Sequence, residues 1–273
     1  VLRQNPLRPE LVNGQLYLIA QINSNDAAKA LDKLVAKLPE AHRYIAIRAL
    51  GLNESKEATK ALQRMAKDRG DLRVRRQAIR VLASGDQEDL DFLHNKRLKY
   101  ESDLRVRALI LELLMNRGQP NLDKDFLTAA KSKDTVYAGV GLEGIGKQKI
   151  KAGLKIIHGA LGHQDVPYRL AAYEALASYG GERQYAAIIE GLQDSINVVV
   201  RPEIGAQLQR AQTADEVSAV ISHCMRSKDL GLVTLCVEAL VVISAKQPQL
   251  CSDALLELMR SSEDKIRSLS IEG

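Results

Sequence analysis

The sequence has few of the residues that build aromatic cores, disulfide scaffolds and membrane spans. Its 273 residues include no Trp, two Phe and three Cys, and no apolar run reaches the roughly 18 residues of a membrane span. Cys224, Cys236 and Cys251 lie far apart, which excludes a disulfide scaffold and a cysteine zinc site. Unpaired cysteines favour a reducing compartment such as the cytoplasm, and nothing else in the sequence names one.

What the chain does contain is aliphatic. Hydrophobic residues make up 45% of it, which is enough at this length to bury a core and argues against intrinsic disorder. With so few aromatics, that core must be built from Leu, Ile, Val and Ala. Alternating runs are also rare, so an all-β domain is not expected.

The net charge of +5 conceals an uneven distribution. Residues 1–155 carry 29 Lys and Arg against 19 Asp and Glu, whereas residues 156–273 carry 10 against 15. A basic first half suggests an anionic partner, although it does not identify one.

A repeat of 31 or 32 residues runs through the chain. Seven residues before the most regular position, the anchor, there is an Arg in five of seven repeats, and eleven before it there is an Asp in five of seven. A small or apolar residue stands four before the anchor. Three columns with one period indicate a repeat architecture. The anchors are Leu50, Leu82, Leu114, Ile145, Leu176, Leu208 and Leu240.

Within each repeat the apolar residues follow helical spacing. Val74, Ala78 and Leu82 recur four residues apart and share one helix face. Asp71 stands at the N-cap position, with Arg75 four residues later. A second apolar stretch with helical spacing precedes each aspartate across a short polar turn. We therefore expect a helix–turn–helix in every repeat and no β-strand; even Val198–Val200 falls in register at the start of a second helix.

The turn aspartate and the Val-Arg pair that opens the second helix resemble the HEAT-repeat family. Asp71 with Val74-Arg75, and Asp103 with the same pair 32 residues on, carry the likeness, and the short form of the repeat is similar to the repeats of phycobilin-lyase-type proteins. The resemblance covers about residues 26–273. Since one helix pair cannot bury its own apolar face, it implies an all-α fold, a right-handed α-solenoid (superhelix) of about seven to eight repeats.

The resemblance also implies roles for the repeated charges. The second helices would line the concave face, and the aspartates and arginines would form a ladder between neighbouring repeats. Ala138 and Val233 interrupt this pattern. The expected structural ladder is Asp71, Arg75, Asp103, Arg107, Asp134, Asp165, Arg169 and Arg201.

Three parts are expected along the chain. Residues 1–25 would be an irregular N-terminal helix or cap, 26–262 the repeat array, and 263–273 the truncated start of a further repeat. Glu263 and Arg267 occupy the Asp and Arg columns of that last part. Because solenoid ends normally carry a polar cap, this predicts a piece of a longer protein.

One glycine-rich stretch matches a nucleotide-binding fingerprint. Gly139, Gly141 and Gly144 have the GxGxxG spacing, and Asp165 follows. The motif requires a preceding strand, whereas this one lies inside an expected helix, so close helix packing is the favoured interpretation. With Gly146 these glycines should also weaken the helix, which leads to the hypothesis of a hinge at 139–146.

No catalytic, cofactor or metal site is expected. His158 and His163 are five residues apart and do not share a helix face. There is no HExxH motif, and there are no repeated His-Glu pairs like those of a di-iron HEAT hydroxylase. GxSxG and Walker patterns are also missing.

The strongest functional signal is a column two residues before the anchor. It changes from Arg48 and Arg80 to Glu112, Glu143 and Glu174 along successive second helices. The alternative is an ordinary solvated face. The candidates for partner binding are Arg48, Arg73, Arg76, Arg80, Lys96, Arg97, Lys99, Tyr44, Tyr100, Glu112, Glu143 and Glu174.

The sequence favours a non-catalytic scaffold that binds a protein or peptide with an acidic segment. A first alternative is nucleic-acid binding by the basic half, which would depend strongly on salt. Without Trp, base stacking would fall to Tyr44 or Tyr100. A second alternative, by family analogy alone, is a subunit of a bilin-lyase-like enzyme.

Overall fold

The computed structural model describes residues 9–260 and 264–272. Every regular element within those ranges is a helix, and no strand occurs in them, as the periodicity predicts. The chain forms two compact units, Val1–Asn121 (unit 1) and Leu122–Gly273 (unit 2). The expectation of one array over 26–262 did not include this division. It falls at a turn where Gly118 and Asn121 both have positive φ.

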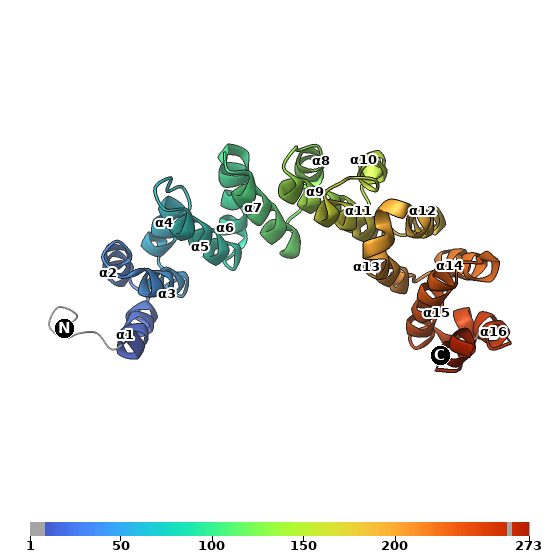
Figure 1. Cartoon of the computed structure of the whole chain (residues 1–273). Coiled ribbons are helices and arrows are strands. Elements are labelled where there is room, and N and C mark those ends of the chain that lie inside the picture. The colour runs from blue at the N-terminus through green and yellow to red at the C-terminus, as the bar shows by residue number, and fades with distance from the viewer. Residues whose placement is uncertain (1–8, 261–263, 273) are drawn as a thin grey trace. The chain divides into compact units, whose positions relative to one another are not determined.

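Unit 1 stacks three helix pairs behind a leading helix (Figure 1). Successive second helices pack on one another, α3 against α5 and α5 against α7, and the leading helix packs against α3. The leading helix is α1 (Pro9–Gln21), and the pairs are α2 (Asn25–Val35) with α3 (Glu40–Gly51), α4 (Lys56–Met65) with α5 (Leu72–Ala83), and α6 (Gln87–Phe92) with α7 (Leu104–Asn116).

Unit 2 continues the pattern with five pairs in its described residues. Its second helices again contact one another in sequence, as α9 with α11 and α15 with α17. The pairs are α8 (Asp123–Ala130) with α9 (Thr135–Lys147), α10 (Leu154–Ala160) with α11 (Val166–Tyr179), α12 (Glu182–Gln193) with α13 (Arg201–Gly205), α14 (Ala214–Arg226) with α15 (Leu230–Ser244), and α16 (Pro248–Leu258) with α17 (Asp264–Glu272).

The anchors form the centre of the core in both units. All seven, from Leu50 to Leu240, have no exposed surface. Their burial confirms that the 32-residue period marks the packed face of each second helix. Stacked aliphatic pairs of this kind are the defining feature of an α-solenoid.

The repeated aspartates begin the second helices. Asp71 accepts hydrogen bonds from the backbone N–H groups of Arg73 and Val74, at 2.9 and 3.0 Å. Asp103, Asp134, Asp165 and Asp229 cap α7, α9, α11 and α15 in the same way. Each cap satisfies N–H groups that have no partner inside the helix, which explains why the residue recurs.

The repeated arginines connect neighbouring repeats within each unit. In unit 1, Arg43 Nη1 lies 2.8 Å from Asp71 Oδ2, and Arg75 Nη2 lies 3.8 Å from Asp103 Oδ2. Each arginine therefore contacts the cap of the next repeat.

Unit 2 makes the same connection with different residues. Arg201 Nη1 lies 3.5 Å from Asp229 Oδ2. Where Ala138 interrupts the pattern, the Thr135 hydroxyl donates to Asp165 Oδ2 at 3.2 Å. This substitution maintains a polar link between repeats at that point.

The sixth repeat differs from the expectation of a continuous second helix. Residues Ser195–Val200 form a 3₁₀ turn, α13 is only five residues long, and Ala206–Arg210 is again 3₁₀. Pro202 lacks an N–H for the helix ladder. Asn197, in the Asp column, is fully buried and accepts from Arg169 Nε at 2.8 Å while donating to the Gly191 carbonyl at 2.7 Å.

The glycines of α9 allow close packing. A Cβ at Gly141 would lie 2.3 Å from the Ala130 nitrogen, and one at Gly146 would lie 2.4 Å from the Ala175 carbonyl oxygen. The division between units falls at 121/122 and not at these glycines. The packing therefore favours the helix-packing interpretation of the GxGxxG match and gives the hinge hypothesis no support.

The ends of the array are regular where they are described. Helix α1 lies within the expected N-terminal helix or cap and buries Val12, Leu16 and Ala20 completely. At the other end α17 packs against α15 and α16, as a second helix would. Glu263 lies outside the described residues.

Candidate functional site

A stripe of arginines follows one face of α5 in unit 1. Arg73, Arg76 and Arg80 are spaced three and four residues apart, which places them on the same side of the helix. Arg48 occupies on α3 the repeat position that Arg80 occupies on α5, and the two helices pack against each other. The sequence thus brings four cations onto adjacent second helices.

One of these arginines is neutralised locally. The Arg73 guanidinium forms an ion pair with Glu40, and the Tyr44 hydroxyl donates to the same carboxylate at 2.9 Å. The hydrogen bonds from Tyr44 and Arg73 lower the pKa of Glu40. Arg73 and Tyr44 therefore belong to a self-contained surface network, and Tyr44 is not a free platform for a base.

The other three, Arg48, Arg76 and Arg80, are called the basic face. Arg48 and Arg80 are exposed, and Arg76 is half-buried with an Nε that has no hydrogen-bond partner. Among the described residues, no carboxylate lies within ion-pair distance of any of them. Their charges are therefore available to a partner.

Arg97 does not belong to this surface, contrary to the expectation from sequence. It is only 8% exposed and forms an ion pair with Glu101, which is 5% exposed. Arg75 Nε lies 3.7 Å from the same carboxylate. Burial lowers the pKa of Arg97, whereas Glu101 acts in the opposite direction. The three side chains form a buried ion cluster, which the local sequence did not indicate.

The helix that supplies Arg97 changes geometry before it ends. Residues Leu93–Arg97 form a π-helix and Leu98–Tyr100 a 3₁₀ turn. Lys96 and Lys99 are exposed, and Lys99 Nζ lies 5.6 Å from the centre of the Tyr100 ring. Tyr100 is 65% exposed, so an exposed aromatic ring beside Lys99 does exist here.

The acidic candidates lie in both units. Glu112 is exposed on α7, so the change from arginine to glutamate is complete within unit 1. In unit 2, Glu174 is exposed, whereas Glu143 Oε1 lies 2.7 Å from Lys147 Nζ. Glu143 is therefore partly neutralised on its own helix.

Metal and membrane features are not found in the described part of the chain. No group of three or more His, Cys, Asp or Glu there could hold a metal ion. None of the helices described is both long and apolar enough to cross a bilayer.

Comparison with known families identifies the segment that holds the basic face. Residues 27–115 match the model of HEAT repeats. Residues 27–115 are HEAT repeats. The match runs from α2 to the last turn of α7, and the HEAT repeats therefore include Arg48, Arg76 and Arg80 as well as the buried ion cluster.

Comparisons with individual proteins add little about function. No curated protein matches the chain. Among solved structures, the chain is similar to human deoxyhypusine hydroxylase in complex with glycerol, with 18% identity over 98% of this chain and 97% of that one, and a TM-score of 0.36. That score is too low to support an argument about activity.

Proposed function

We propose that this protein is a helical-repeat scaffold that binds an acidic segment of another protein through the basic face. The observation that carries the proposal is the contrast among neighbouring arginines. Arg43, Arg73 and Arg75 all have carboxylate partners, whereas Arg48, Arg76 and Arg80 have none among the described residues. Cations left unpaired on one surface attract an anionic partner and orient it.

The test replaces Arg48, Arg76 and Arg80 by Glu in the full chain. Binding of a fluorescent poly-glutamate peptide is measured by anisotropy at low and high salt. We expect affinity to fall by about tenfold or more, because the peptide would meet three like charges. Wild-type affinity should also fall with salt, since exposed charges are screened.

A charge-matched control separates this face from general charge. Lys33, Lys37 and Lys56 are exposed on the first-helix side of unit 1, and changing them to Glu alters the net charge equally. This control should bind the peptide nearly as well as wild type. Equal losses in the two triple variants would refute a specific face.

A second candidate, nucleic-acid binding, is favoured by Tyr100 and its neighbouring lysines. The exposed Tyr100 ring can stack on a base while the amine of Lys99 beside it contacts a phosphate. Single-stranded DNA is the discriminating probe. Affinity for it that depends on Tyr100 and exceeds the affinity for poly-glutamate would favour this function over the first.

A further inference from the structure

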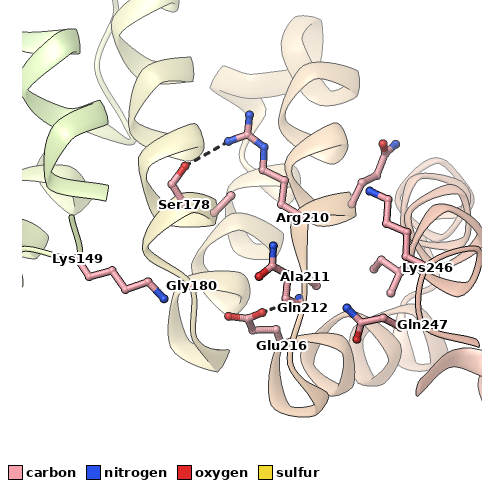
Figure 2. Close-up of a pocket in the computed structure, with 12 residues that line it drawn as sticks. Lys149, Ser178, Gly180, Arg210, Ala211, Gln212, Glu216, Lys246 and Gln247 are labelled. Carbon is pink, nitrogen blue, oxygen red and sulfur yellow. Dashed lines mark hydrogen bonds between the residues drawn. The ribbon is translucent and has the colours of Figure 1, made fainter. Parts of the chain in front are cut away.

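Unit 2 contains a polar pocket that no motif predicted. Its volume is about 570 Å³, and it lies where the second helices of successive repeats end. Lys149 follows α9, Gly180 follows α11, Arg210 ends the 3₁₀ turn after α13, and Lys246 follows α15. In Figure 2 the Lys149 side chain ends near Gly180, the Arg210 guanidinium is turned towards Ser178, and Lys246 lies on the opposite side from Lys149.

Lys149, Arg210 and Lys246 form no ion pair with a carboxylate among the described residues. The only hydrogen bond of the Arg210 side chain among the described residues goes to the Ser178 hydroxyl, at 3.3 Å. The side chains of Lys149 and Lys246 have no ion pair or hydrogen bond within the described residues, although their backbone N–H groups are bonded to the preceding helices. Arg117, at the end of α7 in unit 1, behaves differently, because it donates to the carbonyls of Ala83 and Gly85 at 2.8 and 3.0 Å. Neutralising helix ends therefore accounts for Arg117 but leaves the pocket cations unexplained.

The one carboxylate in the pocket already has its partners. Glu216 accepts from the backbone N–H groups of Gly181, Gln212 and Thr213, at 2.6, 2.8 and 3.1 Å. Burial alone would raise the pKa of Glu216, but these backbone hydrogen bonds outweigh it and lower the pKa. The carboxylate thus joins two loops and fixes the floor of the pocket (Figure 2).

The glycine turn beside Glu216 keeps this floor open. Gly180 and Gly181 both have positive φ, at 77° and 96°. A Cβ at Gly180 would lie 2.7 Å from Glu216 Oε1 and 3.7 Å from Lys149 Nζ. A larger residue there would strain the backbone and push into the pocket.

The positive character of the pocket runs against the charge of its unit. Residues 122–273 contain 17 Lys and Arg against 19 Asp and Glu. The pocket nevertheless gathers three cations, and amide side chains from Gln209, Gln212 and Gln247 complete a lining rich in hydrogen-bond donors. A local excess of this kind selects an anion with several acceptor oxygens.

We propose that the unit 2 pocket binds a small organic phosphate, attracted by the combined positive charge of Lys149, Arg210 and Lys246. A phosphate monoester carries a double negative charge and three terminal oxygens, so a pocket with several cations attracts it more strongly than a carboxylate, which has a single charge and two oxygens. The pocket is also of the size that holds small ligands, so an organic group has space beside Ala177, Ala211 and Ile243.

The experiment uses the full chain and two phosphate probes, inorganic phosphate and glycerol 3-phosphate. Acetate and glycerol at matched ionic strength are the comparison ligands, and binding is followed by calorimetry and by thermal stabilisation. Wild type should bind both phosphates and gain stability from them, as any ligand of the folded state confers. Replacing Lys149, Arg210 and Lys246 by Ala should weaken both affinities by at least about tenfold.

Two further variants make the result decisive. Lys151, Lys155 and Lys228 are exposed in unit 2, and changing all three to Ala removes the same charge without touching the pocket. That control should retain phosphate binding. The basic-face variant, in which Arg48, Arg76 and Arg80 are replaced by Glu, should also retain it, because it leaves the unit 2 pocket unchanged. Failure of the acidic-peptide test therefore leaves this pocket unaffected.

Several outcomes would overturn the proposal. Equal losses in the pocket variant and its control would mean non-specific charge attraction. Wild-type binding to phosphate no stronger than to acetate would mean that the ligand class is wrong. If the triple Ala variant does not fold, Arg210→Gln, which keeps a donor near Ser178, replaces it and should weaken binding severalfold; unchanged binding in that variant would count against the site.

Discussion

The pKa values of two aspartates in unit 1 are shifted in opposite directions by their surroundings. Asp71 is a helix cap, and its hydrogen bond with the Val74 N–H is the largest of the effects that lower its pKa. Asp89, in the first turn of α6, has a buried Oδ1 with no hydrogen-bond partner. Burial, followed by repulsion from Asp86 and Glu88, raises its pKa to about 6.

These shifts have opposite consequences for stability. Because the folded pKa of Asp89 lies above its ordinary value of 3.8, the folded state holds that proton more tightly than the unfolded state. Its contribution to the free energy of unfolding therefore increases as pH falls from about 7 through 6 towards 4. Asp71 has a lowered pKa, so its contribution is present above pH 3.8 and is lost as pH falls through its folded pKa.

Asp89→Asn should remove the penalty of a buried charge. We expect it to stabilise the protein at pH 7 by about 1 kcal/mol, less than the full pKa shift implies because the side chain is partly exposed. The advantage over wild type should vanish near pH 4, where Asp89 is protonated. Thermal melts of wild type and Asp89→Asn between pH 4 and pH 7 measure this difference in stability.

Asp91→Asn is the matched control on the same helix. Asp91 accepts hydrogen bonds from Gln87 and Gln119, which lower its pKa. This variant should therefore gain no stability at pH 7. If the difference in stability between wild type and Asp89→Asn is the same at pH 4 and pH 7, the raised pKa of Asp89 is contradicted.

At the scale of elements, helix α9 shows that glycine content is a poor guide to softness. Four glycines in thirteen residues predict a weak helix from propensity alone. In the structure, α9 lies between α8 and α11 and packs against both. The missing side chains let neighbouring helices approach, so packing supplies what propensity lacks.

Two glycines of α9 should respond to alanine with opposite signs. At Gly144 a Cβ would lie 2.1 Å from the ring of Phe126, which is fully buried and cannot move aside. Gly144→Ala should therefore cost about 1–3 kcal/mol. At Gly139 the nearest atom would be Ala171 Cβ, at an ordinary 3.7 Å. Gly139→Ala should stabilise by up to about 1 kcal/mol through helix propensity.

Chemical denaturation of the two variants measures this difference. Hydrogen exchange over 137–150 tests the hinge hypothesis at the same time. Exchange in wild type should be no faster there than in α11, because the helix is held on both sides. Faster exchange at 137–150, or stabilisation by Gly144→Ala, would contradict the packing argument.

At the scale of the whole molecule, the repeat architecture makes energetic coupling local. Within each unit a helix pair contacts its sequence neighbours, so a defect in one repeat weakens that repeat and its interfaces first. The buried ion cluster of Arg75, Arg97 and Glu101 joins two repeats of unit 1 and is a suitable place to introduce such a defect.

Glu101→Gln should be strongly destabilising, by about 3–5 kcal/mol, because it leaves two buried guanidinium groups without their shared carboxylate. Hydrogen exchange should accelerate mainly in α5, α6 and α7, and protection in α15 should be nearly unchanged. The exposed Glu112→Gln on α7 is the control and should alter stability by less than about 0.5 kcal/mol. Uniform loss of protection along the chain would contradict local coupling.

Some features of the fold could be read from residues close together in the sequence. The anchors, the caps and the helix–turn–helix unit depend on contacts within one repeat or with the identical position of the next, so a period reveals them. The irregular sixth repeat carried a local signal as well, because Asn197 stands where most repeats have Asp, and Pro202 lacks the N–H that a continuous helix needs.

Other features had no such signal. Arg97 has the sequence context of its exposed neighbours Lys96 and Lys99, yet the π-helical turn directs it to Glu101 and into the interior. The unit 2 pocket gathers residues from four repeats, and its only sequence signature is that Lys149, Gly180, Arg210 and Lys246 stand just beyond the second helices of their repeats. Comparing the turns that follow the second helices, repeat by repeat, would bring these residues together.

The sequence by itself therefore determined the class of fold, the register of each helix pair and the position of every anchor, because periodic burial of aliphatic side chains leaves one solution. Only the tertiary structure decided which charged side chains are ion-paired within the protein and which have no partner among the described residues. A cation's availability depends on the distance to carboxylates in other repeats, as the pairing of Arg73 and the isolation of Arg80 show. Spacing along the chain sets the face of a helix, but the partners on that face come from packing.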